Sequence, residues 1–173
     1  MQEQQLREMS FKDPLTQSYN RRFLPRLDEL ADQPWACLMF DLDHFKQIND
    51  TQGHARGDTV LVEFAAFLRS PLGAAENVVR MGGEEFLLLM PGMPREAASA
   101  RLDRLRQRIT EAGQALQVPG LEVTASIGLA QWRPGEDDLA GLLRRADHAM
   151  YVAKRAGRNR VFDGEELDPA APA

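Results

Sequence analysis

Residues 78–90 read VVRMGGEEFLLLM, and this stretch predicts a β-hairpin. Two apolar β-like segments, 77–81 and 86–90, flank the Gly82-Gly83 pair, and paired glycines favour tight turns that need positive φ. The hairpin alone does not explain the Glu84-Glu85 pair. Adjacent carboxylates repel each other unless a cation or a protonated partner relieves the repulsion. The stretch therefore leaves two interpretations open, a plain hairpin and a turn with a function.

The predicted elements on either side of this hairpin alternate between helices and strands. Composition and helical spacing predict helices over residues 20–32, 44–50, 58–69, 94–113 and 137–157. Apolar runs predict strands over residues 34–42, 121–132 and 159–163. The helix ending at residue 69 places five apolar side chains on one face: Val60, Leu61, Phe64, Ala65 and Leu68. This order predicts one α/β domain with a mixed sheet covered by helices.

Composition narrows the possible functions. The chain has 173 residues, which suits one domain, and its net charge of -5 argues against general duplex binding, so no nucleic-acid partner is expected. No apolar run approaches the ~20 residues of a membrane span, and the polar start shows no secretory signal. These features predict a cytoplasmic protein. The single Cys37 lies in an apolar run and is interpreted as a small buried hydrophobic residue.

The two ends of the chain differ from its centre. Residues 1–10 contain good helix formers but too few apolar positions for an isolated helix, so they are interpreted as the end of a connecting helix or linker. This interpretation hints at a larger protein. Residues 164–173 are acidic and rich in Ala and Pro, which predicts a disordered tail.

Two aspartates mark the end of the strand predicted over 34–42. A calcium loop is excluded, because its sixth position would be Lys46 rather than Gly and its twelfth Gln52 rather than Glu. Asp43 is interpreted chiefly as the cap of the next helix. Asp41 has no evident structural partner, so it would need a cation, and the hairpin glutamates would supply further oxygens of a magnesium site.

Basic residues offer two candidate phosphate contacts, although the sequence contains no P-loop. Lys46 falls in the first turn of a short helix, where backbone amides already favour an anion. Lys154 and Arg158 form an i, i+4 pair that is expected to project from one helix face and to grip phosphates together. The alternative is that this pair only complements the negative end of its helix.

Five motifs, in this order and at these intervals, resemble the GGDEF domain of bacterial diguanylate cyclases. They are DPLTQSYNRR at 13–22, DLDHFKQIND at 41–50, GHARGD at 53–58, RMGGEEF at 80–86 and YVAKRAGRN at 151–159. The resemblance covers residues 11–163, which are thereby identified as the catalytic domain. It implies an α+β fold of the nucleotidyl-cyclase and polymerase-palm kind, with a mostly antiparallel central sheet surrounded by helices.

The resemblance also implies roles for particular residues. The positions that would hold Mg²⁺, for which Mn²⁺ can substitute, are Asp41, the carbonyl of Leu42, Glu84 and Glu85. Glu84 would also act as the base for the attacking 3'-hydroxyl, and Lys46 would stabilise charge on the phosphates. The remaining implied positions contact the substrate. Lys154 and Arg158 would hold the terminal phosphates. Asn49 and Asp58 would contact the guanine, and His54 would lie nearby.

By the same resemblance, two GTP molecules are condensed into cyclic di-GMP and two pyrophosphates at the interface of two domains. A homodimer is then needed for turnover, and an upstream sensor or dimerisation domain is expected. The setting would be the bacterial cytoplasm, and membrane tethering of a longer protein stays open. The alternative is a catalytically weak regulatory module that binds GTP or cyclic di-GMP. Such a module is expected to have lost an active-site acid or Lys46, and this sequence retains them all.

Two departures from the family pattern stand out. The family's inhibitory R-x-x-D site corresponds to residues 73–76, which read Gly-Ala-Ala-Glu, so the arginine is absent. Without a guanidinium to pair with the product, little feedback inhibition through this site is expected. Arg69, one helical turn earlier, could replace it only by a shift in register. Ser18 stands where a leucine is common, outside the predicted site.

Overall fold

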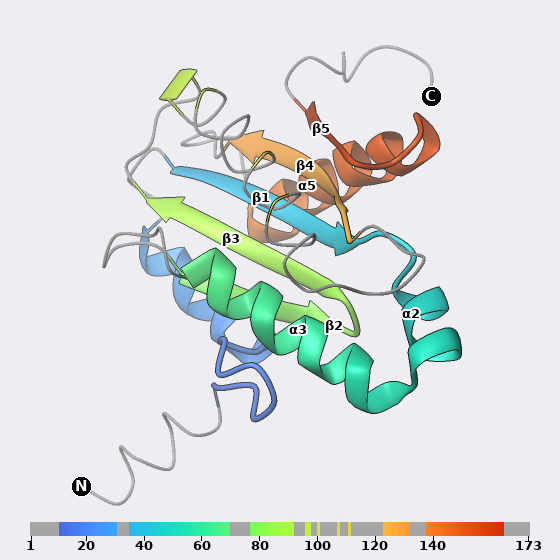
Figure 1. The fold of residues 1–173 in the computed structure, drawn as a ribbon. Coiled ribbons are helices and arrows are strands. Elements are labelled where there is room, and N and C mark those ends of the chain that lie inside the picture. The colour runs from blue at the N-terminus through green and yellow to red at the C-terminus, as the bar shows by residue number, and fades with distance from the viewer. Residues whose placement is uncertain are drawn as a thin grey trace, which may run out of the picture.

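The structure, a computed structural model, describes residues 11–30, 35–69, 77–91, 123–131 and 138–164, with isolated positions between 96 and 111. Figure 1 shows a sheet with helices packed on it. The elements in chain order are η1 (Arg21–Leu30), β1 (Trp35–Leu42), α2 (Phe45–Gln52), α3 (His54–Arg69), β2 (Asn77–Gly82), β3 (Glu85–Pro91), β4 (Ala125–Gln131), α5 (Leu139–Arg155) and β5 (Arg160–Asp163).

The sheet has five strands in the order β2-β3-β1-β4-β5. Strand β1 pairs antiparallel with both β3 and β4, and β2 pairs antiparallel with β3. Only β5 runs parallel to its neighbour β4. The predicted mixed, mostly antiparallel sheet is therefore confirmed, and the first strand of the sequence lies at its centre.

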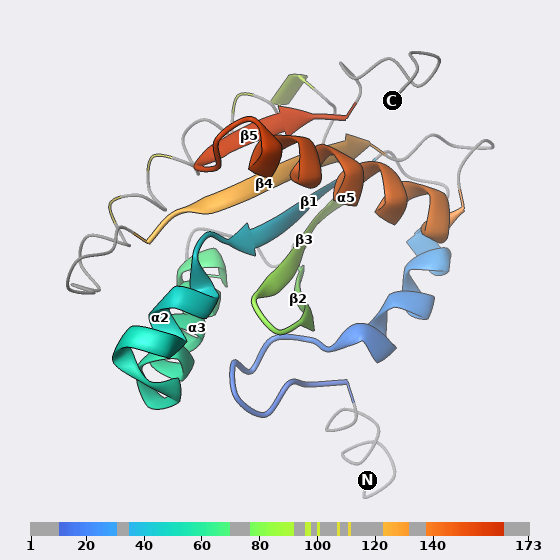
Figure 2. The same cartoon turned by 90° about the vertical axis from the view of Figure 1, so that its right-hand side faces the viewer.

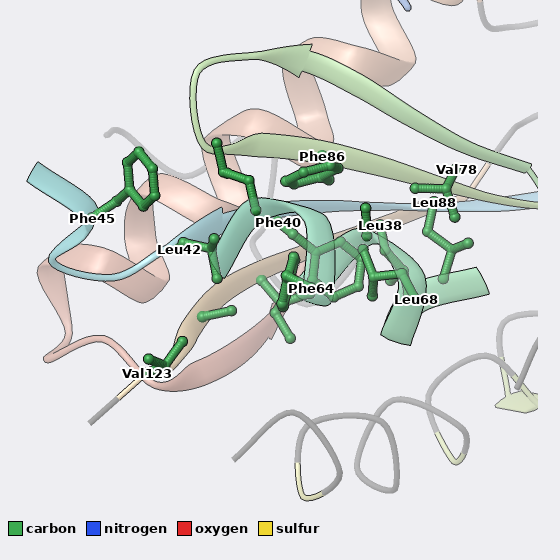
Figure 3. Packing of buried hydrophobic residues seen from close by; sticks show 14 of the residues in the cluster. Leu38, Phe40, Leu42, Phe45, Phe64, Leu68, Val78, Phe86, Leu88 and Val123 are labelled. Atoms are coloured by element: carbon green, nitrogen blue, oxygen red, sulfur yellow. The ribbon is translucent and has the colours of Figure 1, made fainter. Parts of the chain in front are cut away.

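Helices cover both faces of this sheet (Figure 2). Side chains alternate along β1, as a strand requires: Leu38, Phe40 and Leu42 point into the core formed with α2 and α3. Their neighbours Cys37 and Met39 face the opposite core, formed with η1 and α5. Figure 3 shows the first of these cores. Burying each such large apolar side chain stabilises the folded state by about 1.5–3 kcal/mol. Because β1 buries side chains in both cores, it holds the helices on both faces to the sheet.

Two helices differ from the prediction. The predicted helix over 20–32 is the 3-10 helix η1, which contains Pro25, and Asn20 precedes it as expected, since Asn20 Oδ1 accepts from the backbone N of Arg22 at 2.9 Å. Helix α3 begins at His54, four residues before the predicted start at Asp58. All five side chains predicted on its apolar face are buried.

The hairpin is present, but its turn lies one residue later than predicted. Gly82 pairs with Glu85, which leaves Gly83 and Glu84 as the two turn residues. Gly83 has φ 47°, in the left-handed region that glycine adopts freely. The strand register shifts between Arg80 and Gly82. Glu84 therefore lies in the turn, and Glu85 begins β3.

Several predictions lie outside the described residues: the linker over 1–10, most of the helix over 94–113, the ends of the strand over 121–132, the positions 73–76 and the tail beyond residue 164. Among the helices that the structure does describe, none is long and apolar enough to cross a membrane.

Candidate active site

Three carboxylates gather where β1 and β3 meet the hairpin turn. Asp41, near the end of β1, stands directly opposite Glu85, the first residue of β3. The backbone N of Leu42 donates to the backbone O of Glu84 at 3.3 Å. The structure thus brings together the four positions that the sequence analysis assigned to a metal, Asp41, Leu42, Glu84 and Glu85, from two strands far apart in the sequence.

Asp41 is paired with Lys154, from the last turn of α5. Lys154 Nζ lies 2.6 Å from Asp41 Oδ2, and the Asp41 side chain is only 5% exposed. Burial raises the pKa of Asp41, the Lys154 ammonium opposes that rise, and the charges of Glu84 and Asp43 add to it. The expectation that Asp41 lacks a structural partner is wrong, because Lys154 is that partner.

Glu85 shares this crowded negative environment. Burial raises the pKa of Glu85, and the charges of Asp41 and Asp147 raise it further. Asp147, an exposed residue of α5, was not identified from the sequence. Partly desolvated carboxylates that repel one another favour binding of a cation, and oxygen donors suit Mg²⁺. The donor set therefore fits a magnesium ion, although in the described part of the chain no three acidic, His or Cys side chains are already arranged around one.

Asp43 does not cap the following helix, contrary to the prediction. The residue before α2 is His44, with φ 58°, and its side chain makes no capping hydrogen bond. Asp43 is instead buried at 2% exposure and accepts from Thr124 Oγ1, Ser126 Oγ and the backbone N of Asn159. It links the end of β1 to β4 and to the segment after α5.

The predicted phosphate contacts come from two helices. Lys46 is exposed in the first turn of α2, as expected. Lys154 lies in the last turn of α5, which ends at Arg155, and Arg158 lies beyond it with φ 66°. The prediction that Lys154 and Arg158 project from one helix face is therefore wrong, because the chain has left the helix before Arg158.

The predicted guanine contacts lie at the junction of α2 and α3. Asn49 is half-buried on α2, whereas His54 and Asp58 are exposed in the first turns of α3. Asn49 packs against Gly57, and a Cβ at Gly57 would overlap Asn49 Oδ1. A glycine inside a helix is normally unfavourable, so its place here makes room for the Asn49 side chain.

If Asn49 contacts guanine as the sequence analysis predicts, we expect Gly57→Ala to weaken GTP binding while leaving α3 intact. Alanine stabilises a helix interior by about 1 kcal/mol over glycine, but its methyl group displaces Asn49. Loss of the predicted hydrogen bond from Asn49 to the base, about 0.5–1.5 kcal/mol, would raise the KM for GTP about 2- to 10-fold. Steady-state kinetics and thermal melting measure both effects. In an Asn49→Ala background the same substitution should leave KM unchanged, and a further rise there would contradict the assignment.

Arg80 supports the hairpin turn of the site, and the sequence analysis did not identify this role. Its Nε and Nη2 both donate to the backbone O of Gly83, at 3.1 and 2.9 Å. Its Nη1 pairs with Asp13 Oδ2 at 3.1 Å. Burial raises the pKa of Asp13, but hydrogen bonds from Thr16 and Arg80 outweigh burial and hold the pKa below its usual value. Asp13 and Arg80 both lie within motifs quoted above, so the sequence did mark the two positions. Together they anchor the turn that carries Glu84.

Comparisons with known proteins identify the family of this chain. Residues 10–160 match the family model described as diguanylate cyclase, GGDEF domain. The chain is 40% identical over 126 residues to diguanylate cyclase A of Treponema denticola, covering 73% of this chain and 34% of that protein. It is 39% identical over 165 residues to the response regulator PleD of Caulobacter vibrioides, covering 89% of this chain and 36% of that protein. The chain thus spans about a third of the length of these curated relatives.

Solved structures show the same likeness. The coiled coil and GGDEF domain of DgcB from Caulobacter crescentus, in complex with c-di-GMP, superposes with a TM-score of 0.85 at 29% identity, covering 94% of this chain and 90% of that one. The diguanylate cyclase SiaD from Pseudomonas aeruginosa, in complex with its activator SiaC, superposes with a TM-score of 0.83 at 39% identity, covering 94% and 65%.

Proposed function

The chain belongs to the GGDEF family of diguanylate cyclase domains, and on this premise we propose that it condenses two GTP molecules into cyclic di-GMP and two pyrophosphates. The observation that carries the proposal is the convergence of Asp41, Glu84 and Glu85 at one end of β1 and β3. Phosphoryl transfer depends on positioning and charge stabilisation more than on covalent chemistry, and these carboxylates suit that task.

The residues proposed to hold Mg²⁺ are Asp41, the Leu42 carbonyl, Glu84 and Glu85, and Mn²⁺ would fit the same oxygen donors. When bound, the ion would neutralise charge on the phosphates and make the attacking hydroxyl more acidic. Glu84, on the turn anchored by Arg80, would accept the proton of that 3'-hydroxyl. The 3'-oxygen then bonds to the α-phosphorus as pyrophosphate leaves, with Lys46 stabilising the charge on the phosphates.

Lys154 has two alternative partners in this scheme. In the structure its ammonium lies against Asp41 and offsets a buried negative charge. In the nucleotide complex we place it on a terminal phosphate, together with Arg158, which frees the Asp41 oxygen for the metal. The ion pair with Asp41 would then keep the site ordered before substrate arrives.

Lys154→Met should destabilise the metal-free protein at neutral pH. Leaving the Asp41 carboxylate unpaired costs about 1–3 kcal/mol, less than for a fully buried pair because Lys154 is 30% exposed. Loss of Lys154 moves the already raised pKa of Asp41 further up, so the deficit should be largest at neutral pH and should shrink as acid protonates Asp41. Thermal melting of the metal-free variant and the wild type at neutral and at acidic pH measures this deficit. The exposed Arg144→Met on the same helix is the control, and equal melting temperatures for the two variants would contradict the account.

Guanine recognition is proposed for Asn49 and Asp58, with His54 beside them. A carboxylate at Asp58 can accept from N1-H and the exocyclic amine of guanine, donors that adenine does not present in that arrangement. GTP should therefore be used in preference to ATP. We also propose that the domain works in the bacterial cytoplasm, where GTP is available.

Turnover is proposed to need a homodimer, because each bound GTP must present its α-phosphate to the 3'-hydroxyl held by a second domain. Since the chain spans about a third of its curated relatives, we also propose that an upstream sensor or dimerisation segment, joined through residues 1–10, controls how often two domains meet.

The proposal is tested by incubating the purified chain with GTP or ATP and Mg²⁺ and separating the products by chromatography. Cyclic di-GMP formed from GTP alone, at a specific activity that rises with protein concentration, is the expected result. Binding of GTP or cyclic di-GMP without turnover at any protein concentration, even when dimerisation is forced by a fused coiled coil, would support the regulatory-module alternative instead.

Cyclic di-GMP is expected to inhibit the reaction weakly through the positions of the family's inhibitory site. Residues 73–76 supply no arginine there, and the nearby Arg69 is engaged elsewhere, since its Nη1 donates to the backbone O of Thr16 at 2.8 Å. Titration of cyclic di-GMP into the assay measures the effect. Tight inhibition that is abolished by mutating Glu76 would show that this site works after all.

A further inference from the structure

The backbone just after α5 adopts an unusual conformation at two successive residues. Arg158 and Asn159 have φ of 66° and 45°, so both lie in the left-handed region without being glycine. Such a conformation costs an ordinary residue about 1–2 kcal/mol, less for Asn. It persists where surrounding structure enforces it, and it is often found at functional sites.

Asp43 contacts this segment directly. Its Oδ2 accepts from the backbone N of Asn159 at 2.9 Å, although the two residues are 116 positions apart. The carboxylate is held by two hydroxyls, Thr124 Oγ1 at 2.7 Å and Ser126 Oγ at 2.6 Å. A buried carboxylate with three donors is a rigid anchor for the peptide that joins Arg158 to Asn159.

The other side of Arg158 is fixed as well. Its backbone N donates to the O of Ala153 at 3.0 Å, and its own carbonyl accepts from Arg160 Nε at 2.9 Å. The Arg158 side chain, by contrast, is exposed and makes no hydrogen bond or ion pair with any residue that the structure describes. Its backbone is therefore held firmly while its guanidinium is available to an anion from outside.

Asp43 is not needed for the other tasks that its place would suggest. It does not cap α2, and three donors already hold its two oxygens. A buried charge is also weak evidence for a purely stabilising role, because apolar replacements often serve as well. What distinguishes Asp43 is its position two residues after Asp41, which ties the strand end of the site to Arg158.

We infer that Asp43 is a positioning residue that fixes Arg158 beside the active-site end of β1, so that the guanidinium meets the terminal phosphates of the nucleotide. This inference rests on the proposed function for the identity of the ligand. Asp43 acts only through the backbone of residues 158–159 and does not touch substrate.

The experiment compares Asp43→Asn, which keeps the shape but loses the charge, with the wild-type chain. KM for GTP should rise on the order of tenfold, as expected for about 1.4 kcal/mol of lost binding, while kcat changes little because the contact is made in the ground state as well. In an Arg158→Ala background, Asp43→Asn should add nothing. An equal rise in KM in both backgrounds would overturn the inference.

Binding measurements separate this inference from the proposed activity. With Mg²⁺ present, Asp43→Asn should weaken GTP binding but leave GMP binding unchanged, since GMP lacks the terminal phosphates. Equal weakening of both would overturn the positioning role, whether or not the chain makes cyclic di-GMP. Asn159→Gly keeps the N-H and tolerates positive φ, so it should bind GTP as the wild type does. If Asp43→Asn does not fold, Ser126→Ala, which removes one of the carboxylate's donors, should show the same GTP-specific effect in smaller degree, and its absence would count against the inference.

Discussion

Replacing Glu84 with glutamine should abolish turnover and leave the fold unchanged. Glutamine is nearly isosteric but cannot accept the proton of the 3'-hydroxyl, and general-base catalysis typically contributes about 10²–10⁴-fold. Glu84 also lies on a two-residue turn, half-exposed, so little packing depends on its charge. Cyclic di-GMP formation measured against GTP concentration should show a collapse in kcat, with thermal melting close to that of the wild type.

The matched control is Glu63→Gln, which makes the same chemical change at an exposed position of α3. It should keep full activity. A Glu84→Gln variant that turns over GTP at the wild-type rate would refute the assigned base, whereas a variant that is inactive because it has unfolded would be recognised by its melting curve.

Gly128→Ala should prevent the domain from folding stably. Strand β4 and helix α5 approach so closely at this residue that a Cβ would overlap the backbone O of Ala146 and the backbone N of Met150. Backbone atoms of a helix cannot move aside as a side chain can, so the cost should reach or exceed the ~1–3 kcal/mol typical of overpacking. The same close packing places α5 where Lys154 can reach Asp41.

Circular dichroism and urea unfolding of Gly128→Ala measure this effect. The control is Ala140→Val, which adds more volume at an exposed position on α5 and should unfold near the wild-type urea midpoint. A Gly128→Ala variant as stable as the wild type would show that the helix does not rest on the strand as closely as described.

Local patterns predicted the fold well because they record which face of each element is buried. The five apolar side chains of α3 from Val60 to Leu68 are buried as expected, and the alternation along β1 divides its side chains between two cores. The start of α3 was missed because Gly57 is a poor helix former. Its reason for being there, the side chain of Asn49, belongs to another helix and cannot be read from local propensity.

The sequence predicted that certain residues lie together, but it did not predict most of their contacts. Resemblance to a family identified Asp41, Glu84 and Glu85, and the structure brings them together. The partner of Asp41 lies 113 residues away on α5, and the donors to Asp43 lie more than 80 residues away. A helix cap was the natural local interpretation of Asp43. It was wrong because tertiary hydrogen bonds from β4 and the segment after α5 satisfy that carboxylate instead.

The negative charge of the site is only partly balanced. Lys154 pairs with Asp41, but the pKa of Glu85 is raised by burial and by the neighbouring carboxylates. Removing one of these acids should relieve the repulsion among the others and so stabilise the fold, at the expense of activity. Such an exchange of stability for function is common at active sites. In this respect Glu84 and Glu85 are explained by the nucleotide and metal that we propose they bind rather than by folding.

The central claim is tested most directly by counting products. The purified chain, supplied with GTP and Mg²⁺ over a range of protein concentrations, should release two pyrophosphates for each cyclic di-GMP formed, at a rate that rises faster than in proportion to protein. The account would be contradicted by GTP that stays intact at every concentration under forced dimerisation, or by hydrolysis that yields pyrophosphate without any cyclic dinucleotide.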